Sequence, residues 1–224
     1  AYHDHNGKTM RPRLLEQLGT GKSVAYASEA GTPMIADPGF DLAREAAGKG
    51  HLVTTAPGPS AALAALTLAG LPTDRFLFAG FLPNTKTARR SQLQALGDVP
   101  ATLVFYESPK RLAAMLGDAA EVLGAERNAA YCRELTKKFE EVQRGTLAEL
   151  VERTGSLTLK GEVVVLIDRA ASGSVNQEDI VSALRRALQS MSVRDASETV
   201  AQAYGLPKRK IYQMALEFDK EEDR

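Results

Sequence analysis

The chain has 224 residues, of which 44% are hydrophobic and 25% charged, and its 28 basic residues balance its 28 acidic ones. These proportions are typical of a folded globular protein and exclude a disordered, collagen-like or disulfide-stapled chain. With no net charge, any RNA site must be a local basic patch. The single Cys132 cannot form an internal disulfide, which fits a reducing cytoplasm, and no apolar run approaches the roughly 20 residues that span a bilayer.

Apolar β-rich runs alternate with helical patterns over the first 170 residues, which is typical of βα units with a largely parallel sheet. The pattern predicts strands at 23–27, 51–56, 75–81, 101–106, 128–133 and 161–168, with one more short strand at 139–145. It predicts helices at 8–18, 38–47, 60–69, 86–96, 109–123 and 146–153. The unbroken apolar run at 163–167 indicates a strand covered on both faces. Residues 80–84 are the best candidate for a linker between two α/β units.

The composition changes after residue 170, where 171–174 reads as a flexible joint and the remainder as helix. Ser192 can cap a second helix of this tail, Gly205 can end it, and Pro207 can open a third. Apolar residues share one face of the first helix at Ile180, Leu184, Ala187, Leu188 and Met191. A packing domain or dimer clamp explains this appendage as well as nucleic-acid contact does.

Four turns that follow predicted strands carry polar or glycine-rich sequence: 28–39, 56–60, 105–111 and 133–138. The first has no Gly-Lys-Ser/Thr of a phosphate loop and no three-glycine dinucleotide fingerprint. Its Asp37 and Pro38 resemble a helix N-cap followed by the first helical residue. Because ligands of open α/β sheets bind at the carboxyl ends of strands, these turns predict one functional edge. Tight turns without a ligand are the alternative.

Metal binding and nucleophilic hydrolysis are poorly supported by the sequence. His3, Asp4 and His5 have a metal-like composition, but no further ligand accompanies them, so we expect no metal. No Gly-x-Ser-x-Gly elbow is present.

Several co-linear motifs resemble one family across almost the whole chain. They are Ser-Glu-Ala-Gly-Thr-Pro-Met-Ile-Ala-Asp-Pro-Gly-Phe at 28–40, Pro-Gly-Pro-Ser-Ala at 57–61, Gly-Leu-Pro-Thr-Asp-Arg-Phe at 70–76, Gly-Phe-Leu-Pro at 80–83, Phe-Tyr-Glu-Ser-Pro at 105–109, Arg-Glu-Leu-Thr-Lys at 133–137 and Lys-Gly-Glu at 160–162. In order and spacing they resemble the bacterial 16S rRNA ribose 2′-O-methyltransferase I family, of the tetrapyrrole (corrin/porphyrin) methylase superfamily. Glu29 stands where that family usually has Asp, and its first strands find no match here.

The resemblance implies an α/β fold of two tetrapyrrole-methylase-type domains and a helical C-terminal tail. The first domain, with a parallel sheet, would be the remainder of a methyl-donor domain at 1–80. The second, with a mixed sheet, would occupy 81–170, and the tail 171–224. The resemblance further implies a cytoplasmic homodimer that binds S-adenosylmethionine between the domains and methylates a decoding-centre cytidine of 16S rRNA in the small ribosomal subunit.

By position in the motifs, the resemblance implies that the cofactor is bound by Gly31, Thr32, Pro33, Ile35, Pro57, Ser60, Ala61, Gly161 and Glu162. A ribose hydroxyl is a very weak acid, so a base or a nearby cation should help it lose its proton. The candidate catalytic residues at the predicted edge are Glu107, Arg133, Glu134 and Lys137. The preferred assignment makes Glu134 the orienting base and Arg133 or Lys137 the partner of a phosphate or oxyanion. A solvated salt-bridge network is the alternative for these charges.

RNA contact needs local positive charge, and residues 84–111 carry five cations against Asp98 and Glu107. The predicted RNA footprint consists of Lys86, Arg89, Arg90, Lys110, Arg111, Lys208, Arg209 and Lys210. We expect no DNA or membrane partner. The rival functions are a tetrapyrrole-type small-molecule methylase and a non-enzymatic ribosome-binding protein.

Overall fold

The computed structural model describes residues 1–3, 6–155, 159–170, 177–204 and 206–222. The chain divides into two compact units, residues 1–169 and residues 170–224. The sequence-predicted division of the first unit at residue 80 stays a prediction.

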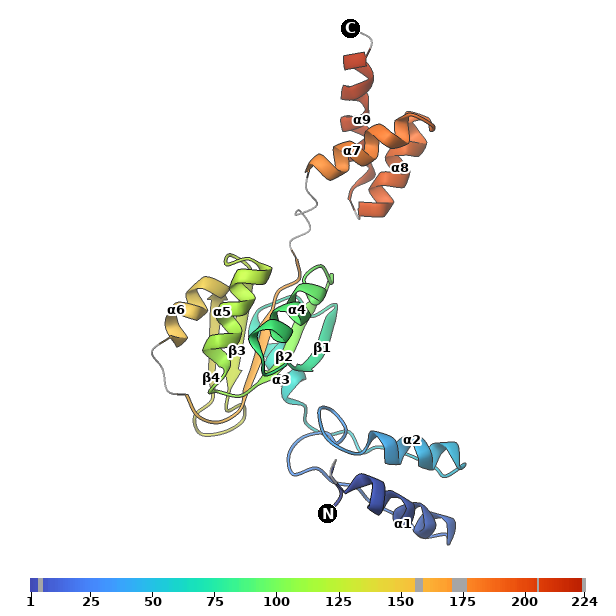
Figure 1. Cartoon of the computed structure of the whole chain (residues 1–224), viewed down its shortest axis with the longest axis vertical. Helices are drawn as coiled ribbons and strands as arrows, with labels where there is room; N and C mark the ends of the chain where they lie inside the picture. The colour runs from blue at the N-terminus through green and yellow to red at the C-terminus, as the bar shows by residue number, and fades with distance from the viewer. Residues whose placement is uncertain (4–5, 156–158, 171–176, 205, 223–224) are drawn as a thin grey trace. The chain divides into compact units, whose positions relative to one another are not determined.

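The first unit is built on a mixed five-stranded sheet, coloured green to orange in Figure 1. Its strands are β1 (Phe76–Phe81), β2 (Thr102–Glu107), β3 (Asn128–Arg133), β4 (Glu141–Thr146) and β5 (Val163–Ile167), in the spatial order β1-β2-β5-β3-β4. β1 and β2 are parallel, whereas β5 runs antiparallel to both of its neighbours and β4 antiparallel to β3. The carboxyl ends of β1, β2 and β3 therefore lie at the same edge as the amino ends of β4 and β5.

Alternate residues of the three inner strands enter two separate cores, as the period of two in a strand requires. Val163, Val165 and Ile167 of β5 pack on one face, and Val164 and Leu166 on the other. The first face is covered by α4 (Lys86–Leu96), α5 (Leu112–Leu123) and α6 (Leu147–Thr154), seen side by side in Figure 1. The second face is covered by the alanine-rich α3 (Ala61–Ala69), whose small side chains permit close packing. β5 is buried along its whole length, as the sequence predicts.

Two further helices, α1 (Gly7–Gly19) and α2 (Phe40–Gly48), pack on each other through a small apolar cluster of Leu15, Leu42 and Ala46. The Arg11 guanidinium pairs with the Glu45 carboxylate of α2. The predicted strands at 75–81, 101–106, 128–133, 139–145 and 161–168 and all six predicted helices are confirmed to within a few residues.

The predicted strands at 23–27 and 51–56 are wrong. Both segments are irregular, because a strand exists only as part of a hydrogen-bonded ladder and no described strand pairs with either. Leu52 is 92% exposed and Val53 46% exposed, so their apolar side chains have no described core to enter. The described part of the first 75 residues thus contains helices and loops, without the parallel sheet expected there.

The second unit is a three-helix bundle of α7 (Gln177–Leu188), α8 (Val193–Tyr204) and α9 (Lys208–Glu222). Its core is made of Ile180, Leu184, Ala196, Val200, Ala201, Ile211 and Ala215. Ser192 caps α8 as predicted, because its Oγ accepts a hydrogen bond from the Asp195 N–H at 3.2 Å. Pro207 immediately precedes α9, whereas Gly205 and the expected joint at 171–174 lie outside the described residues.

The single cysteine is predicted to be chemically inert in the folded protein. Cys132 lies fully buried in β3, and burial raises the pKa of its thiol to about 11. At pH 8 a disulfide exchange reagent should therefore fail to modify the native protein and should modify one thiol per chain once urea unfolds it. Rapid modification without denaturant would contradict the placement of Cys132 in the core.

Candidate functional site

The carboxyl edge of the sheet brings together the strand ends that the sequence singles out. Glu107 of β2 and Arg133 of β3 both lie opposite Val163 of β5, and Phe81 of β1 lies opposite Tyr106. Of the four turns predicted to share one edge, those at 105–111 and 133–138 follow strands that end at this edge, whereas the segments that precede 28–39 and 56–60 are not strands.

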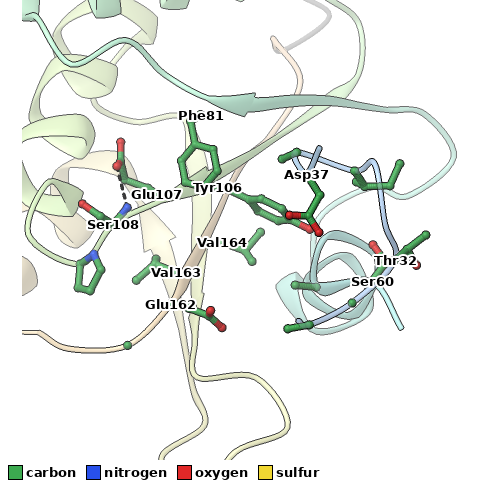
Figure 2. A pocket seen from close by; sticks show the side chains of 17 residues that line it. Thr32, Asp37, Ser60, Phe81, Tyr106, Glu107, Ser108, Glu162, Val163 and Val164 are labelled. Carbon is green, nitrogen blue, oxygen red and sulfur yellow. Dashed lines mark hydrogen bonds between the residues drawn. The ribbon is translucent and has the colours of Figure 1, made fainter. Parts of the chain in front are cut away.

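A cavity of about 390 Å³ opens at this edge, between the sheet and the loop that precedes α2 (Figure 2). Figure 2 shows Tyr106, Glu162 and Val164 on the sheet side and Thr32, Asp37 and Ser60 on the loop side. The lining residues are Ala30, Gly31, Thr32, Ile35, Ala36, Asp37, Ser60, Ala61, Phe81, Tyr106, Glu107, Ser108, Pro109, Gly161, Glu162, Val163 and Val164. This volume lies within the range of about 300–1,000 Å³ that is usual for small-molecule sites.

Most of the predicted cofactor-binding residues meet in this cavity. Those that line it are Gly31, Thr32, Ile35, Ser60, Ala61, Gly161 and Glu162. The other two, Pro33 and Pro57, line a neighbouring cavity that shares only Gly31 and Thr32 with the first.

The loop at 28–39 owes its shape to residues with left-handed backbone. Gly31 and Gly39 adopt φ of 74° and 125°, and Met34 and Ala36 adopt φ of 70° and 56°. At Gly39 glycine is required, because a Cβ there would approach the Tyr26 ring to 2.8 Å. The loop is tied to the segment before α3 by the Thr32 hydroxyl, which donates a 3.0 Å hydrogen bond to the Pro59 carbonyl.

The predicted helix start at Asp37 and Pro38 is wrong, since α2 begins at Phe40 with Gly39 as its N-cap. The left-handed backbone of Gly39 delays the helix by two residues. Asp37 is therefore not a cap, and it lines the cavity instead.

The cavity lining carries negative charge only. The carboxylates of Asp37 and Glu162 line it, and none of its described lining residues is Lys or Arg. A cationic ligand would be stabilised in such a cavity, whereas a phosphate would be repelled.

Glu107 is also among the lining residues, but its side chain is inaccessible to solvent and points away from the cavity (Figure 2). Its Oε1 accepts a 2.7 Å hydrogen bond from the Ser108 N–H. Its Oε2 lies 3.2 Å from Arg111 Nη2, an ion-pair distance without hydrogen-bond geometry, and no described donor is aligned with it. Burial raises the pKa of Glu107 despite the Ser108 N–H and the Arg111 charge, so this carboxylate is a stronger base than an exposed glutamate.

Glu134 holds the start of β5 in place. Its Oε1 accepts hydrogen bonds from the Glu162 N–H at 3.1 Å and from Lys137 Nζ at 3.0 Å. The same Lys137 Nζ donates to Glu162 Oε2 at 3.0 Å. At Gly161, with φ of 95°, any Cβ would overlap the Glu134 carboxylate. The hydrogen bond from Lys137 lowers the pKa of Glu134, which makes it a weaker base than usual.

The predicted catalytic group is therefore split. Glu107 is among the lining residues with its carboxylate turned away from the cavity, whereas Arg133, Glu134 and Lys137 are absent from the described lining. Arg133 Nε donates to Glu141 Oε2 at 2.8 Å, and its Nη1 donates to the Lys160 carbonyl at 3.1 Å. These three residues form the ion-pair network that the sequence left open as the alternative, and it supports the strand that enters the cavity.

The predicted RNA footprint is also divided by burial. Arg89 is only 6% exposed and pairs with the buried Asp118 at 2.6 Å, so it is a core residue and the prediction that it contacts RNA is wrong. Its neighbour Arg90 also pairs with Asp118, at 2.8 Å, and with Glu121. These ion pairs join α4 to α5 through two of the cations that the sequence assigned to RNA.

Arg111 likewise acts inside the protein, because its Nη2 donates to the carbonyls of Leu82 at 2.7 Å and Pro83 at 3.1 Å. Lys208 is exposed and pairs with Glu198. The remaining predicted RNA-binding cations are exposed: Lys86, Lys110, Arg209 and Lys210.

Sequence reasoning missed several lining residues, above all Asp37, Phe81, Tyr106 and Ser108. All four lie in the quoted motifs at 28–40, 80–83 and 105–109, in which the sequence assigns roles in the site only to Gly31, Thr32, Pro33, Ile35 and Glu107. The Tyr106 ring stacks edge-on against Phe81 with centroids 5.8 Å apart, and that contact depends on the register of β1 against β2.

Within the described residues, no group of three or more His, Cys, Asp or Glu side chains could hold a metal ion. His3 is described, whereas Asp4 and His5 lie outside the described residues. Among the same described residues, no helix has the length and apolarity that crossing a bilayer requires.

Most of the chain is similar in sequence to known methyltransferases. Residues 3–151 match the family Tetrapyrrole (Corrin/Porphyrin) Methylases, and residues 175–218 match the RsmI C-terminal HTH domain. The ribosomal RNA small subunit methyltransferase I of Mesorhizobium japonicum is 47% identical over 218 residues, which cover 97% of this chain and 74% of that protein. The protein of the same name from Pseudomonas aeruginosa is 41% identical over 222 residues, covering 97% of this chain and 79% of that protein.

Solved structures share the fold at low sequence identity. Diphthine synthase aligns with a TM-score of 0.55 at 18% identity, covering 75% of this chain and 68% of its own. The methyltransferase CobJ aligns with a TM-score of 0.54 at 21% identity, covering 72% and 70%. A Thermus thermophilus uroporphyrin-III C-methyltransferase complexed with S-adenosylhomocysteine aligns with a TM-score of 0.50 at 20% identity, covering 74% and 75%. The expected tetrapyrrole methylase fold, α/β with a mixed sheet and C-terminal helices, is thus confirmed.

Proposed function

Since the chain belongs to the tetrapyrrole methylases and, among them, to the small-subunit ribosomal RNA methyltransferases I, we propose that it transfers a methyl group from S-adenosylmethionine to the 2′-hydroxyl of a cytidine in 16S rRNA. The structural observation that carries the proposal is the cavity at the carboxyl edge of the sheet, lined by the carboxylates of Asp37 and Glu162. Two parts of this proposal rest on the resemblance of the sequence motifs: the 2′-hydroxyl as the methyl acceptor and the decoding-centre position of the cytidine.

The described residues of the cavity fit this cofactor. S-adenosylmethionine carries a positive sulfonium and an ammonium group and no phosphate, and the cavity offers the carboxylates of Asp37 and Glu162 without a Lys or Arg in its described lining. Opposite charges attract strongly in a partly buried site. A nucleotide such as ATP would bring its phosphates against the same carboxylates.

Small residues would let the cofactor approach the backbone closely. Gly31 and Gly161 have no side chain to block it, and Ala61 adds only a methyl group at the first turn of α3. The Ser60 hydroxyl makes no capping bond to α3, so it is available for the carboxylate of the methionyl group, which the amino end of the helix also attracts. Phe81 and Tyr106 supply apolar and aromatic surface.

Bound in the cavity, S-adenosylmethionine supplies a methyl group on a positively charged sulfur. The protein has to align the attacking oxygen with that carbon and accept the proton of the hydroxyl. The Glu107 carboxylate is unsuited to accept it, because its side chain is inaccessible to solvent and points away from the cavity (Figure 2), and Glu134 is absent from the described lining. Glu134 instead acts as a positioning residue, with Lys137 and Arg133 as its neighbours in the network.

The RNA footprint proposed for the first unit consists of the exposed Lys86 and Lys110. Lys110 follows Pro109, which lines the cavity. In the second unit, Arg209, Lys210 and Lys208 of α9 are the proposed contacts. Both groups would neutralise phosphates of the small ribosomal subunit.

The proposed state of the enzyme is a homodimer in the cytoplasm. A reducing compartment suits the single buried thiol of Cys132, which has no disulfide partner in the chain. Sedimentation equilibrium over a range of protein concentrations tests the dimer.

Transfer of a labelled methyl group tests the function directly. Small ribosomal subunits that lack the modification should gain label from S-adenosylmethionine, and the label should survive alkali in a dinucleotide, because a methylated 2′-oxygen cannot attack its own phosphate. Label in an alkali-labile nucleotide would exclude ribose methylation. Transfer to a tetrapyrrole and not to RNA would favour a small-molecule methylase, and subunit binding without cofactor binding would favour a non-enzymatic ribosome-binding protein.

The role of Glu134 is tested by two variants that both remove its charge, of which only one keeps a side-chain acceptor. E134Q keeps an oxygen for the Glu162 N–H, whereas E134A removes it and frees the start of β5. Loss of one such acceptor should weaken S-adenosylmethionine binding about tenfold in E134A, measured by titration calorimetry, with E134Q close to the native affinity. A fall in turnover of E134Q with unchanged cofactor affinity would instead favour Glu134 as the base.

The RNA footprint is tested by the salt dependence of subunit binding. The double variant K86A/K110A should bind small subunits more weakly, and its slope of log K against log salt should be shallower by roughly 1.4, which is about 0.7 per lost phosphate contact. K49A, which removes an equally exposed lysine at the end of α2, serves as the matched control. A slope unchanged in the double variant would remove both lysines from the footprint.

A further inference from the structure

The loop that joins β3 to β4 exposes the aromatic ring of Phe139 to solvent. Phe139 is 65% exposed, although phenylalanine is among the side chains that proteins most often bury. The ring belongs to the segment 134–140, none of which enters the cores of the sheet apart from the partly buried Leu135. Single exposed apolar side chains are common on protein surfaces, so exposure by itself indicates no ligand, and the surroundings of the ring have to do so.

Internal hydrogen bonds fix the shape of this loop. The Thr136 N–H donates to Glu140 Oε2 at 2.7 Å, the Lys137 N–H to the Glu134 carbonyl at 3.0 Å, and the Glu140 N–H to the Lys137 carbonyl at 3.1 Å. Glu134 and Thr136 adopt left-handed backbone, with φ of 51° and 63°. Because the loop is already ordered, little conformational entropy of the loop is lost when a ligand binds Phe139.

The loop is fastened to the wall of the cofactor cavity. Lys137 Nζ donates to Glu162 Oε2 at 3.0 Å, and Glu162 lines the cavity. Glu134, at the start of the loop, accepts the Glu162 N–H. A ligand on Phe139 would therefore be held by the same loop that is bonded to the cavity wall.

The charge beside the ring is positive and available. Lys138 Nζ lies 5.6 Å from the centroid of the Phe139 ring, a cation–π distance. No carboxylate of the described chain forms an ion pair with Lys138. An aromatic face next to an unpaired lysine is the combination with which proteins bind single-stranded nucleic acid, through base stacking and phosphate contact.

We propose that Phe139 is a stacking platform for an unpaired base of the RNA substrate and that Lys138 contacts the phosphate beside that base. This inference rests on the proposed function and adds to it a residue that selects an unstacked RNA segment at the cavity. The stacked base holds the RNA, and the loop's bonds to Glu162 keep it near the methyl donor.

Phe40 of α2 provides a matched comparison within the same chain. It is 63% exposed and has the Arg44 guanidinium 5.1 Å from its ring centroid, much like Phe139 and Lys138. Arg44, however, is neutralised by Asp41 at 2.7 Å, and Phe40 is absent from the described lining of both cavities. Exposure alone therefore does not distinguish the two rings, whereas the free cation and the link to the cavity do.

The test uses the absence of tryptophan from this sequence. In F139W the new side chain is the only tryptophan, so its fluorescence reports on that position alone, and F40W is the control. Titration with a cytidine-rich single-stranded RNA should quench F139W saturably and leave F40W unchanged, because stacking on a base quenches indole fluorescence. This readout needs neither S-adenosylmethionine nor turnover.

A second variant separates stacking from simple apolar contact. F139L keeps an apolar side chain but removes the aromatic face, so it should raise the KM for small subunits about tenfold, with kcat and S-adenosylmethionine affinity unchanged. F40L should leave the KM at the native value.

Three results would overturn the inference. They are an F139W signal that RNA does not change, a native KM in F139L, or a loss of dimer in F139L on sedimentation, which would assign the ring to a protein contact. If methyl transfer by the native protein to ribosomal RNA continues in those cases, only the role of Phe139 fails. If RNA quenches F139W but the native protein transfers no methyl group, the RNA contact stands and the proposed reaction fails.

Discussion

The antiparallel placement of β5 between β2 and β3 is the constraint on which the site depends. Because Val163 lies opposite both Glu107 and Arg133, the start of β5 and the ends of its two neighbours meet at one edge. A shift of β5 by one residue would exchange the side chains that enter the two cores, and every buried residue from 163 to 167 opposes it. The hydrophobic register of one strand thus fixes which polar residues face the cavity.

The entry into β5 is fixed from the other side by the fit of Gly161 to Glu134. A side chain at 161 would occupy the space of the Glu134 carboxylate, and that carboxylate in turn accepts the Glu162 N–H. Lys137 then closes the arrangement by bonding both acids. A carboxylate that already accepts hydrogen bonds from a lysine and a backbone N–H is a weak base. The residues at 133–137 are therefore better explained as positioning the cavity wall than as the catalytic centre.

The sequence predicts best where local pattern and long-range pairing agree. The helix at 86–96 and the strand at 128–133 have the bounds expected, because apolar periodicity and the flanking turn residues specify them locally. The segments at 23–27 and 51–56 have strand-like composition but no described ladder partner, and composition cannot supply one. Arg89 shows the same limit for a side chain, because its burial depends on Asp118, 29 positions away on another helix.

The distribution of charge separates the two proposed ligands. Acidic groups line the cavity, whereas lysines outside its described lining, such as Lys110 and Lys138, are exposed. A cationic cofactor and a polyanionic RNA require opposite surroundings, and in a chain with no net charge both can be provided only by sorting charge locally. Internal ion pairs and hydrogen bonds engage Arg89, Arg90 and Arg111, which stabilise α4, α5 and the segment after β1. The basic run at 84–111 therefore serves the fold first, and counting its charges overestimates the surface that RNA can use.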